Sequence, residues 1–470
     1  MDKLDQLIAD FASFVWGLPL IILLIGGGLY FLILSKFLPF RYIGHAIQVL
    51  RGKYDDPNDP GQITHFQALS TALSSTIGMG NIAGVAVAIS IGGPGAMFWM
   101  WVSAIVGMST KFFTCTLAIM YRGKDSKGKL QGGPMYFIME GLGKSWKPLA
   151  IMFSVCGLIG ALPLFNVNQL TQAINYIILK PNGIEVNFVS NLIIGIVLIT
   201  ITSFVILGGL SRISKIASKL VPIMVVLYFI LVLIILGINI EVVPKYLVLI
   251  FTDAFTADNY TGDAMFGGVL GALILLGIRR GAFSNEAGIG TAPMAHGAAK
   301  TNEPIREGLV AMLGPAIDTL IVCTLTALAI LVTGVWQNEV VIDEGTSESF
   351  KGIILTVTAF ESSIPSVGAY LLLICIVVFS MSSLFSFSYY GTKCMSFLLG
   401  ADKKHYYNYF YIFSIIVGAT ASLSMMINLI DGVFALMAIP TMIATIILAP
   451  KVVKEFKAYS KRIKEDKHDG

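Results

Sequence analysis

The chain has 470 residues, of which 56% are hydrophobic and only 13% are charged, and its formal net charge is +4. An ordinary soluble domain carries about 25% charged residues, so the composition excludes a water-soluble fold and predicts that lipid surrounds most of the surface. Five scattered cysteines without a CxxC pair and five dispersed histidines argue against disulfides and against a thiolate metal site.

Eleven apolar stretches are long enough to cross a bilayer, which requires about 20 residues per helix. The first, Phe14 to Ser35, is too long for a signal peptide and lacks its basic flank, so we expect it to remain as a leading helix. Next, Pro39 to Leu50 mixes apolar and basic residues at helical spacing, which predicts a helix on the membrane surface. Ten core helices follow, at 64–90, 95–121, 148–179, 187–208, 213–238, 264–294, 306–335, 366–398, 405–425 and 428–449.

The distribution of Lys and Arg predicts the orientation of these spans. If the N-terminus is outside, the inner loops and the tail hold 27 of the 32 Lys and Arg residues, while the outer loops are acidic. Cytoplasmic loops carry such an excess of basic residues. We therefore predict a multi-pass protein of the plasma membrane, the inner membrane of a bacterium, with its N-terminus outside and its C-terminus cytoplasmic.

Two of the ten core helices contain dense glycine and polar residues. They are Ser74 to Gly84 (SSTIGMGNIAG) and Gly281 to Gly290 (GAFSNEAGIG), and both include Asn-x-Ala-Gly. Glycine costs a helix about 1 kcal/mol relative to alanine, and lipid cannot satisfy the freed backbone groups. Glycine in a membrane helix often serves close packing, but packing does not require Asn, Ser and Glu beside it. The pattern predicts two interrupted helices around a wet cavity.

Each interruption falls in the first helix of a five-helix half. Because five is odd, the halves, 64–239 and 264–449, must cross the membrane in opposite directions. Paired interrupted segments in corresponding positions point to the binding site of a transporter. The predicted organisation adds a leading part, 1–63, with the first span and the surface helix, and a basic cytoplasmic tail, 450–470.

The two interruptions also carry a family resemblance. STIGMGNIAGVAVAISIGGPG, from Ser75 to Gly95, and RGAFSNEAGIGTAP, from Arg280 to Pro293, resemble the signature segments of the alanine/glycine:cation symporter family. The resemblance runs from about residue 14 to residue 450. It implies an all-α membrane protein with the inverted-repeat fold of the bacterial leucine transporter, and sodium-coupled uptake of a small neutral amino acid, alanine or glycine. It implies neither an enzyme nor a cofactor other than the coupling ion.

One departure from the family pattern lies in the eighth core helix. Relatives usually have Thr-Thr and a Trp there, where this chain has Ser382-Ser383 and Phe387. The hydroxyl groups that would hold a cation are kept, but one wall of the pocket is changed.

An amino acid needs partners for its carboxylate and its ammonium group. Backbone N–H groups at the start of a half-helix bind carboxylates well, and unwound carbonyls near Gly281 would accept from the ammonium. The resemblance adds Gln169, which on its own would more often join two helices. The candidate substrate residues are Gly78, Met79, Gly80, Asn81, Gln169, Phe283, Ser284, Asn285 and Phe387.

Sodium prefers oxygen ligands. The hydroxyls of Ser382 and Ser383, together with the carbonyls of Ser74 and Ile77 in the first interruption, are the candidate cage. A serine in a membrane helix otherwise bonds to its own helix, so the resemblance carries much of this prediction.

Ionisable residues at membrane depth are usually functional. Lys111, Glu286 and Asp318 are the candidates, and we favour an ion pair of Lys111 with Asp318 that holds a gate. Arg279 and Arg280 are further counter-charges. Asp431 is predicted to cap the start of the tenth core helix.

Several alternatives stay open. A proton could replace sodium if Glu286 or Asp318 titrates, and the smaller Phe387 could admit glutamine. A channel or a receptor-like protein is the alternative of another class, although neither pore loops nor a large soluble domain is visible. We expect amino acid, sodium and lipid as partners, no nucleic acid, and make no prediction of the oligomeric state.

Overall fold

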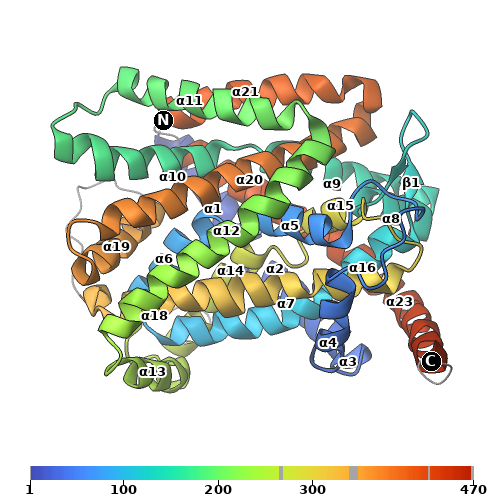
Figure 1. The fold of residues 1–470 in the computed structure, drawn as a ribbon, viewed down its shortest axis with the longest axis horizontal. Helices are drawn as coiled ribbons and strands as arrows, with labels where there is room; N and C mark the ends of the chain where they lie inside the picture. The colour runs from blue at the N-terminus through green and yellow to red at the C-terminus, as the bar shows by residue number, and fades with distance from the viewer. Residues whose placement is uncertain (1, 264–267, 338–347, 422–423, 467–470) are drawn as a thin grey trace.

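The computed structural model describes residues 2–263, 268–337, 348–421 and 424–466, and most of them are helical (Figure 1). In this part of the chain, eight helices are long and apolar enough to cross a membrane, and a pair bent by 56°, His65–Thr76 with Gly80–Gly92, gives a ninth candidate. These nine match predicted spans. The spans predicted at 264–294 and 405–425 also contain helices, but they are not among the nine, so the total of eleven remains a prediction.

The first half of the chain begins with a leading helix in pieces and then forms the first predicted repeat. The leading helices are α1 (Asp2–Val15), α2 (Leu18–Ile21), α3 (Gly27–Leu34) and α4 (Leu38–Leu50). The helices that follow are α5 (His65–Thr76), α6 (Val85–Gly92), α7 (Gly95–Met120), α8 (Pro134–Leu142), α9 (Lys147–Gly160), α10 (Leu164–Ile174), α11 (Phe188–Ile206) and α12 (Gly209–Ile238). A two-stranded hairpin, β1 (Gly123–Lys124) and β2 (Leu130–Gln131), precedes α8.

The second half starts after the connecting helix α13 (Val243–Thr256). Its helices are α14 (Gly268–Asn285), α15 (Thr291–His296), α16 (Pro304–Ala311), α17 (Leu313–Pro315), α18 (Thr324–Val332), α19 (Glu348–Ser363), α20 (Gly368–Leu399), α21 (Lys404–Thr420), α22 (Ser424–Leu436) and α23 (Ala438–Asp466). Helix α23 continues through residue 450, where the sequence suggested that a tail begins.

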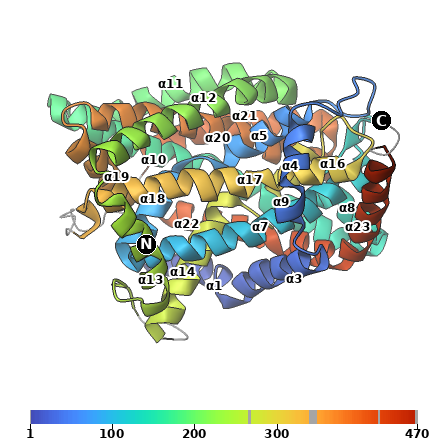
Figure 2. The ribbon, with the colours of Figure 1, turned by 60° about the horizontal axis from the view of Figure 1, so that its bottom comes forward.

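The interrupted helices lie in the middle of the bundle. Helix α5 packs against α12 and α20, while α14 runs along α7. In Figure 2, α1 and α3 lie along one face of the molecule, and α11 and α12 lie along the opposite face. The predicted surface helix is indeed a helix, α4, and it packs against α16. Its position on a membrane surface remains a prediction.

The first interruption separates α5 from α6. Thr64 starts α5 with a capping box, in which its hydroxyl accepts from the Gln67 amide and its own amide donates to the Gln67 side chain. The helix ends at Thr76, and Ile77 has an extended backbone with φ −74° and ψ 98°. One π-helical turn, Gly80–Gly84, then leads into α6. This confirms the predicted break.

The second interruption separates α14 from α15. Glu286 (φ +54°), Gly288 (φ +92°) and Gly290 (φ +109°) all have left-handed backbone, which glycine adopts without steric cost and which is unusual for glutamate. A Cβ atom added at Gly290 would lie within 2.9 Å of atoms of Thr441, Phe153 and Pro134, so no larger residue fits without a shift. The glycines therefore permit both the turn and the close packing around it.

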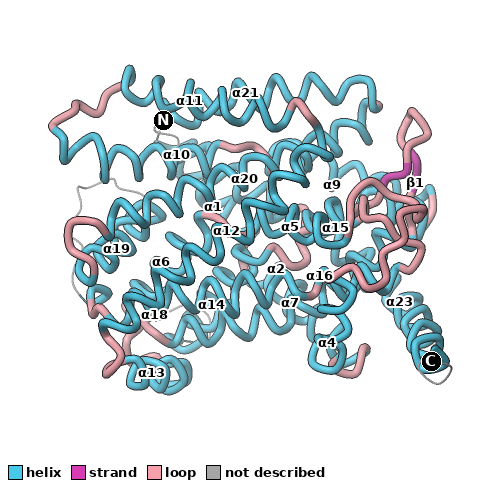
Figure 3. Tube along the Cα trace, viewed as in Figure 1, coloured by secondary structure: helices cyan, strands magenta, loops and turns pink. Residues whose placement is uncertain are grey.

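Most of the basic loops meet at one end of the molecule, which we call the basic end and define as residues 51–63, 122–133, 206–213, 297–306 and 393–404. Loops gather there around β1, α8 and α16 (Figure 3). Arg122 binds carbonyls of residues 60 and 301, Ser126 accepts from the Ala401 amide, and Lys127 pairs with Asp402 at 2.5 Å. The structure thus supports grouping these loops on one side, as their charge predicts.

Candidate substrate and cation site

A cavity of about 390 Å³ lies between the two interruptions. Small-molecule pockets typically measure about 300–1,000 Å³, so this one suits a small ligand. Both breaks and α10, α20 and α22 contribute to its walls. The lining residues are Ser75, Thr76, Gly78, Met79, Gly80, Gly84, Gly160, Leu162, Phe165, Asn166, Gln169, Arg279, Arg280, Phe283, Ser284, Glu286, Ser383, Phe387, Asn428, Ile430, Asp431 and Phe434.

Seven of the nine candidate substrate residues line this cavity. They are Gly78, Met79, Gly80, Gln169, Phe283, Ser284 and Phe387. The other two, Asn81 and Asn285, are buried and bind within the protein: Asn285 Oδ1 accepts from the Ala287 amide at 3.0 Å, which supports the turn of the second break.

Asn81 connects the two breaks. Its side-chain oxygen accepts from the Gly78 amide at 2.9 Å, while its side-chain nitrogen donates to Ser284 Oγ at 3.2 Å and to Asp318 Oδ1 at 2.8 Å. The Gly78 amide is therefore occupied, which leaves the amides of Met79 and Gly80 on the cavity wall as candidates for a carboxylate.

The three buried ionisable candidates are close enough to interact, but not as predicted. Lys111, on α7, is within electrostatic reach of Glu286 and Asp318. The Asp318 carboxylate is instead held by Asn81, by Ser284 at 2.8 Å and by Thr319 at 2.7 Å. Among the described residues, Lys111 and Asp318 do not form a direct ion pair in this conformation. Asp318 lies in a π-helical stretch, Ala316–Cys323, and such bulges frequently occur at functional sites.

The candidate cation residues meet at the first break. Ser382 Oγ lies 3.2 Å from the Ser74 carbonyl oxygen, and Ser383 Oγ lies 3.5 Å from that of Ser75. Each hydroxyl also lies within hydrogen-bond distance of the Phe379 carbonyl on its own helix, at 2.8 and 3.1 Å, as an alternative acceptor. Gly78 lies directly against Ser383, since a side chain there would come within 2.7 Å of the hydroxyl. Ile77 is the extended residue beside them.

Comparison with known proteins identifies the family. A profile of the sodium:alanine symporter family matches residues 1–470. The chain belongs to this family. It is therefore a membrane transporter and not an enzyme.

Two named relatives and one solved structure illustrate the similarity. The sodium/alanine symporter AgcS of Methanococcus maripaludis is 39% identical over 451 residues, 95% of each chain. The probable sodium/glutamine symporter GlnT of Bacillus subtilis is 34% identical and covers 99% of this chain and 92% of its own. The crystal structure of MhsT with L-phenylalanine has a TM-score of 0.61 at 15% identity, covering 83% of this chain and 89% of that one. That likeness supports the predicted helical fold of the leucine-transporter type, whereas the exact repeat layout and the total of eleven spans remain predictions.

Three charged residues that the sequence analysis named, Arg279, Arg280 and Asp431, also line the transporter's cavity, which it did not predict. Arg279 and Arg280 lie within α14, where they line the cavity, so they do not belong to the basic loops. Asp431 lies in the middle of α22, so the predicted helix cap is wrong, and it is within electrostatic reach of both arginines. The signal that could have placed them at the cavity is the presence of a charged residue inside an apolar stretch.

Sequence reasoning also missed a third interruption. Helix α9 ends at Gly160, and α10 starts only after Pro163, inside the span predicted at 148–179. Gly160 and Leu162 line the cavity. Proline cannot donate a helical hydrogen bond, so Gly160-Ala-Leu-Pro163 was a readable sign of a break.

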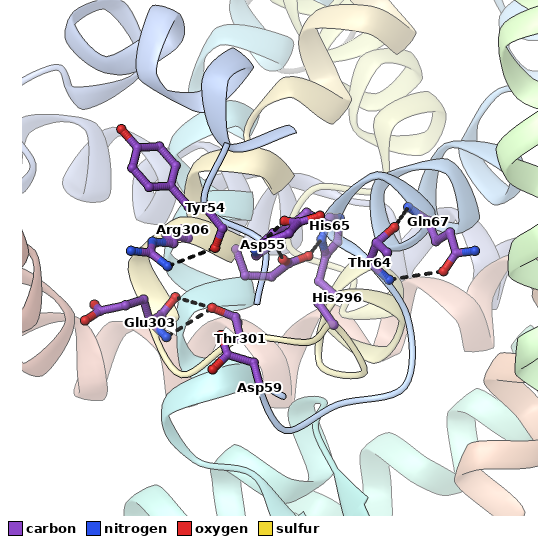
Figure 4. Close-up of polar contacts among 12 residues, drawn as sticks. Tyr54, Asp55, Asp59, Thr64, His65, Gln67, His296, Thr301, Glu303 and Arg306 are labelled. Atoms are coloured by element: carbon purple, nitrogen blue, oxygen red, sulfur yellow. Dashed lines mark hydrogen bonds and ion pairs between the residues drawn. The ribbon is translucent and has the colours of Figure 1, made fainter. Parts of the chain in front are cut away.

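At the basic end of the transporter, two histidines bind one buried glutamate, and Figure 4 labels the two histidines, His65 and His296. Glu307 on α16 contacts the Nδ1 atom of His65 and, at 2.5 Å, that of His296. His65 is the first residue of α5, and His296 is the last residue of α15. One carboxylate therefore joins the ends of both interrupted helices.

Arg122 joins further loop segments at the same end of the molecule. Its guanidinium donates to the carbonyls of Pro60 at 2.9 Å, Gly297 at 3.0 Å and Thr301 at 3.3 Å, and also contacts that of Ala299. Burial lowers the pKa of Arg122 to about 10, so it remains a cation at neutral pH. We call His65, His296, Glu307 and Arg122 the latch. None of the four lines the cavity.

Proposed function

We propose that the protein is a sodium-coupled symporter that carries a small neutral amino acid, alanine or glycine, into the cell. The observation that carries the proposal is the cavity between two interrupted helices, with backbone amides on its wall and a pair of hydroxyls beside it. The names of relatives such as AgcS support sodium and alanine.

The cavity offers a partner for each end of an amino acid. The amides of Met79 and Gly80 would hold the carboxylate. Gln169 is 1% exposed and lines the cavity, and its side-chain oxygen has no hydrogen-bond partner within the described residues. An unpaired buried acceptor costs about 1–3 kcal/mol, and a substrate ammonium group would remove that cost. We assign this role to Gln169.

The space beside these groups sets the substrate size. Phe283 bounds it on α14, where its ring packs against Trp16 and Phe165, and Phe387 bounds it on α20, where its ring packs against Tyr390 and Phe434. A methylene more or less changes binding in such a pocket by only about 1–3 kcal/mol. A charged side chain would be buried without a partner at a much larger cost.

For the cation, we propose that Ser382 and Ser383 supply hydroxyl oxygens and that the first break supplies carbonyls from Ser74 and Ile77. Both serines can donate to Phe379 on their own helix, which leaves their lone pairs directed at an ion. We further propose that the basic end faces the cytoplasm, because basic loops mark that side.

Uptake by the purified protein in proteoliposomes tests the function. An inward sodium gradient should drive accumulation of labelled alanine, and replacing sodium with potassium should abolish it. A protonophore at constant sodium should leave uptake unchanged. Uptake that requires a proton gradient and not sodium would instead support the proton-coupled alternative.

Competition by unlabelled amino acids tests the substrate. Alanine and glycine should compete well, serine less, and glutamate or lysine hardly at all. Competition by glutamine stronger than by alanine would favour the glutamine alternative, to which GlnT and the smaller Phe387 point. Strong inhibition by a charged amino acid, with none by alanine, would refute the assignment.

A further inference from the structure

A second cavity, of about 310 Å³, lies at the basic end and is separate from the transport site. It is formed by the elbow between α11 and α12, the β1–β2 hairpin, the end of α20 and the start of α21. The elbow joins two candidate spans, Phe188–Ile206 and Gly209–Ile238, and α20 ends another, Gly368–Leu399. Because the ends of three candidate spans meet there, we infer that the cavity lies at the depth of lipid headgroups.

Three lysines line one side of this cavity. Lys129 and Lys404 are exposed, whereas Lys393 is 4% exposed. Lys393 Nζ donates to the Met294 carbonyl at 2.8 Å and to the Tyr389 hydroxyl at 3.0 Å. A bound anion would favour the ammonium form of Lys393, which has three N–H donors, and the third would then be available to the ligand. The Ser396 hydroxyl and the Asn408 side-chain NH₂ group add further donors, while the Thr392 hydroxyl is already bonded to Ser388 and Asn408.

The one acidic residue of the lining does not cancel this charge for a ligand. The Asp125 carboxylate is occupied within the hairpin, by the amides of Lys127 and Lys129 at 2.9 and 3.0 Å and by the Gln131 side chain at 3.1 Å. These hydrogen bonds stabilise the hairpin and position Lys129 at the cavity.

The opposite wall of the cavity is apolar. Ile206, Leu207, Leu210 and Ile213 of the elbow form it, and Leu207 is 58% exposed. Nearby Phe204 is 72% exposed. In a membrane protein such side chains contact acyl chains, so the cavity combines a cationic wall with a wall that continues into the lipid. A soluble anion would use only the first of these two walls.

We propose that this cavity binds a phosphate-bearing anion, presented by the headgroup of an anionic phospholipid. Basic pockets between membrane helices on the cytoplasmic side bind such headgroups. The phosphate would contact Lys129, Lys393 and Lys404, and the acyl chains would leave along the Leu207 wall.

The site also touches the latched end of the transporter. Lys393 holds the Met294 carbonyl of α15, and Gln62, which lines the same cavity, donates its amide to the Ala298 carbonyl at 2.8 Å. A bound headgroup would thus stabilise the segment that follows the second break.

Thermal unfolding of the purified protein in detergent tests this site without requiring transport. A ligand that binds only the folded state raises Tm. Phosphatidylglycerol should raise Tm, whereas equal amounts of phosphatidylcholine should not. In the double variant Lys129→Gln/Lys404→Gln, the half-saturating amount of phosphatidylglycerol should rise about tenfold. Both lysines are exposed, so the variant should fold.

The matched control is Lys124→Gln/Lys403→Gln, which removes the same charge from the same hairpin and helix start, outside the cavity lining. It should respond to phosphatidylglycerol as the native protein does. An equal loss in this control, an equal shift with phosphatidylcholine, or no shift with any phosphate would overturn the proposal. A shift with inorganic phosphate alone, lost in the first variant, would keep the site and assign it to a soluble anion.

Discussion

The hydroxyls of Ser382 and Ser383 illustrate how a residue pair can serve both folding and ion binding. Without an ion, they bridge α20 to carbonyls of the first break, over 308 residues of sequence in each case. With an ion, the same oxygens could turn their lone pairs to it and donate to Phe379 instead. In both cases the two serines keep α20 close to the end of α5.

Replacing both serines by alanine should weaken sodium binding. A hydrogen bond to a charged group is worth about 1.5–3 kcal/mol, and we expect loss of two oxygen ligands to be comparable, so the sodium concentration for half-maximal uptake should rise at least about tenfold. Ser154→Ala is the control, because this buried serine bonds only to its own helix, at the Ala150 carbonyl. Unchanged sodium dependence in a folded double variant would remove Ser382 and Ser383 from the site.

At this scale, the sequence identifies residues better than their partners. Asn81 and Glu286 stand out because glycines surround them in an apolar chain. The contact of Asn81 with Asp318 spans 237 residues, and no local pattern encodes which distant side chain will meet it. For the same reason the predicted pairing of Lys111 with Asp318 was not found, and the two histidines of the latch looked unrelated.

Two helix ends meet at the basic end of the transporter. Helix α5 begins at the capping box of Thr64 and then places His65 against Glu307, while α15 ends at His296 on the same carboxylate. A parallel bridge between Ile63 and Ala299 continues the contact outside the helices. The latch therefore joins the two interrupted helices at one end, while the cavity lies at their breaks.

Glu307→Gln should open this end more often. The amide removes the negative charge that both histidines contact, and hydrogen bonds to a charged group are worth about 1.5–3 kcal/mol each. A cysteine at Thr76, which lines the cavity at the last turn of α5, should report the opening. With the variant, its modification by a thiol reagent applied from the basic end should be at least about tenfold faster.

Glu303→Gln provides the comparison for this experiment. Glu303 precedes the same helix, but it pairs with Arg462 near the surface, where ion pairs contribute only about 0–1 kcal/mol. In the Glu303→Gln variant, the cysteine at position 76 should react with the thiol reagent as fast as it does without that substitution. Equal rates in the Glu307 and Glu303 variants would show that the latch does not control access.

At the scale of helices, apolar length predicted most spans and glycine density predicted both main breaks. The third break, before Pro163, was missed because the apolar run continues across it. Helices α13 and α19 were missed because they lie in regions assigned to loops, where no span-length signal exists. The length of an apolar stretch indicates a helix that crosses lipid, but it gives no sign of the short helices at the ends of the bundle.

The whole molecule has one strongly basic end, and its orientation can be tested directly. Cysteines introduced at Lys124, in the hairpin, and at Lys245, on α13, replace exposed lysines predicted to lie on opposite sides of the membrane. The first should react with an impermeant reagent only from the cytoplasm, and the second only from outside. The outer segment predicted at 340–350 lies largely outside the described residues, so Lys245 serves in its place.

The native cysteines should not disturb this assay, because all five are buried. The unmodified protein, labelled from each side, gives the background. The reverse pattern, with Lys124→Cys labelled only from outside, would invert the topology and would also place the proposed headgroup site in the outer leaflet.

Arg122, in the first predicted half of the chain, binds one carbonyl of the leading part, that of Pro60, and three carbonyls of the second half, those of Gly297, Ala299 and Thr301. Because one guanidinium makes all these bonds, a movement of either half strains them together. We therefore expect this end to open cooperatively, as other bistable interfaces do, with few partly open forms. A carrier of this kind should lose few coupling ions without moving substrate, so an arginine outside the transport site would help to set the ratio of ions to amino acid.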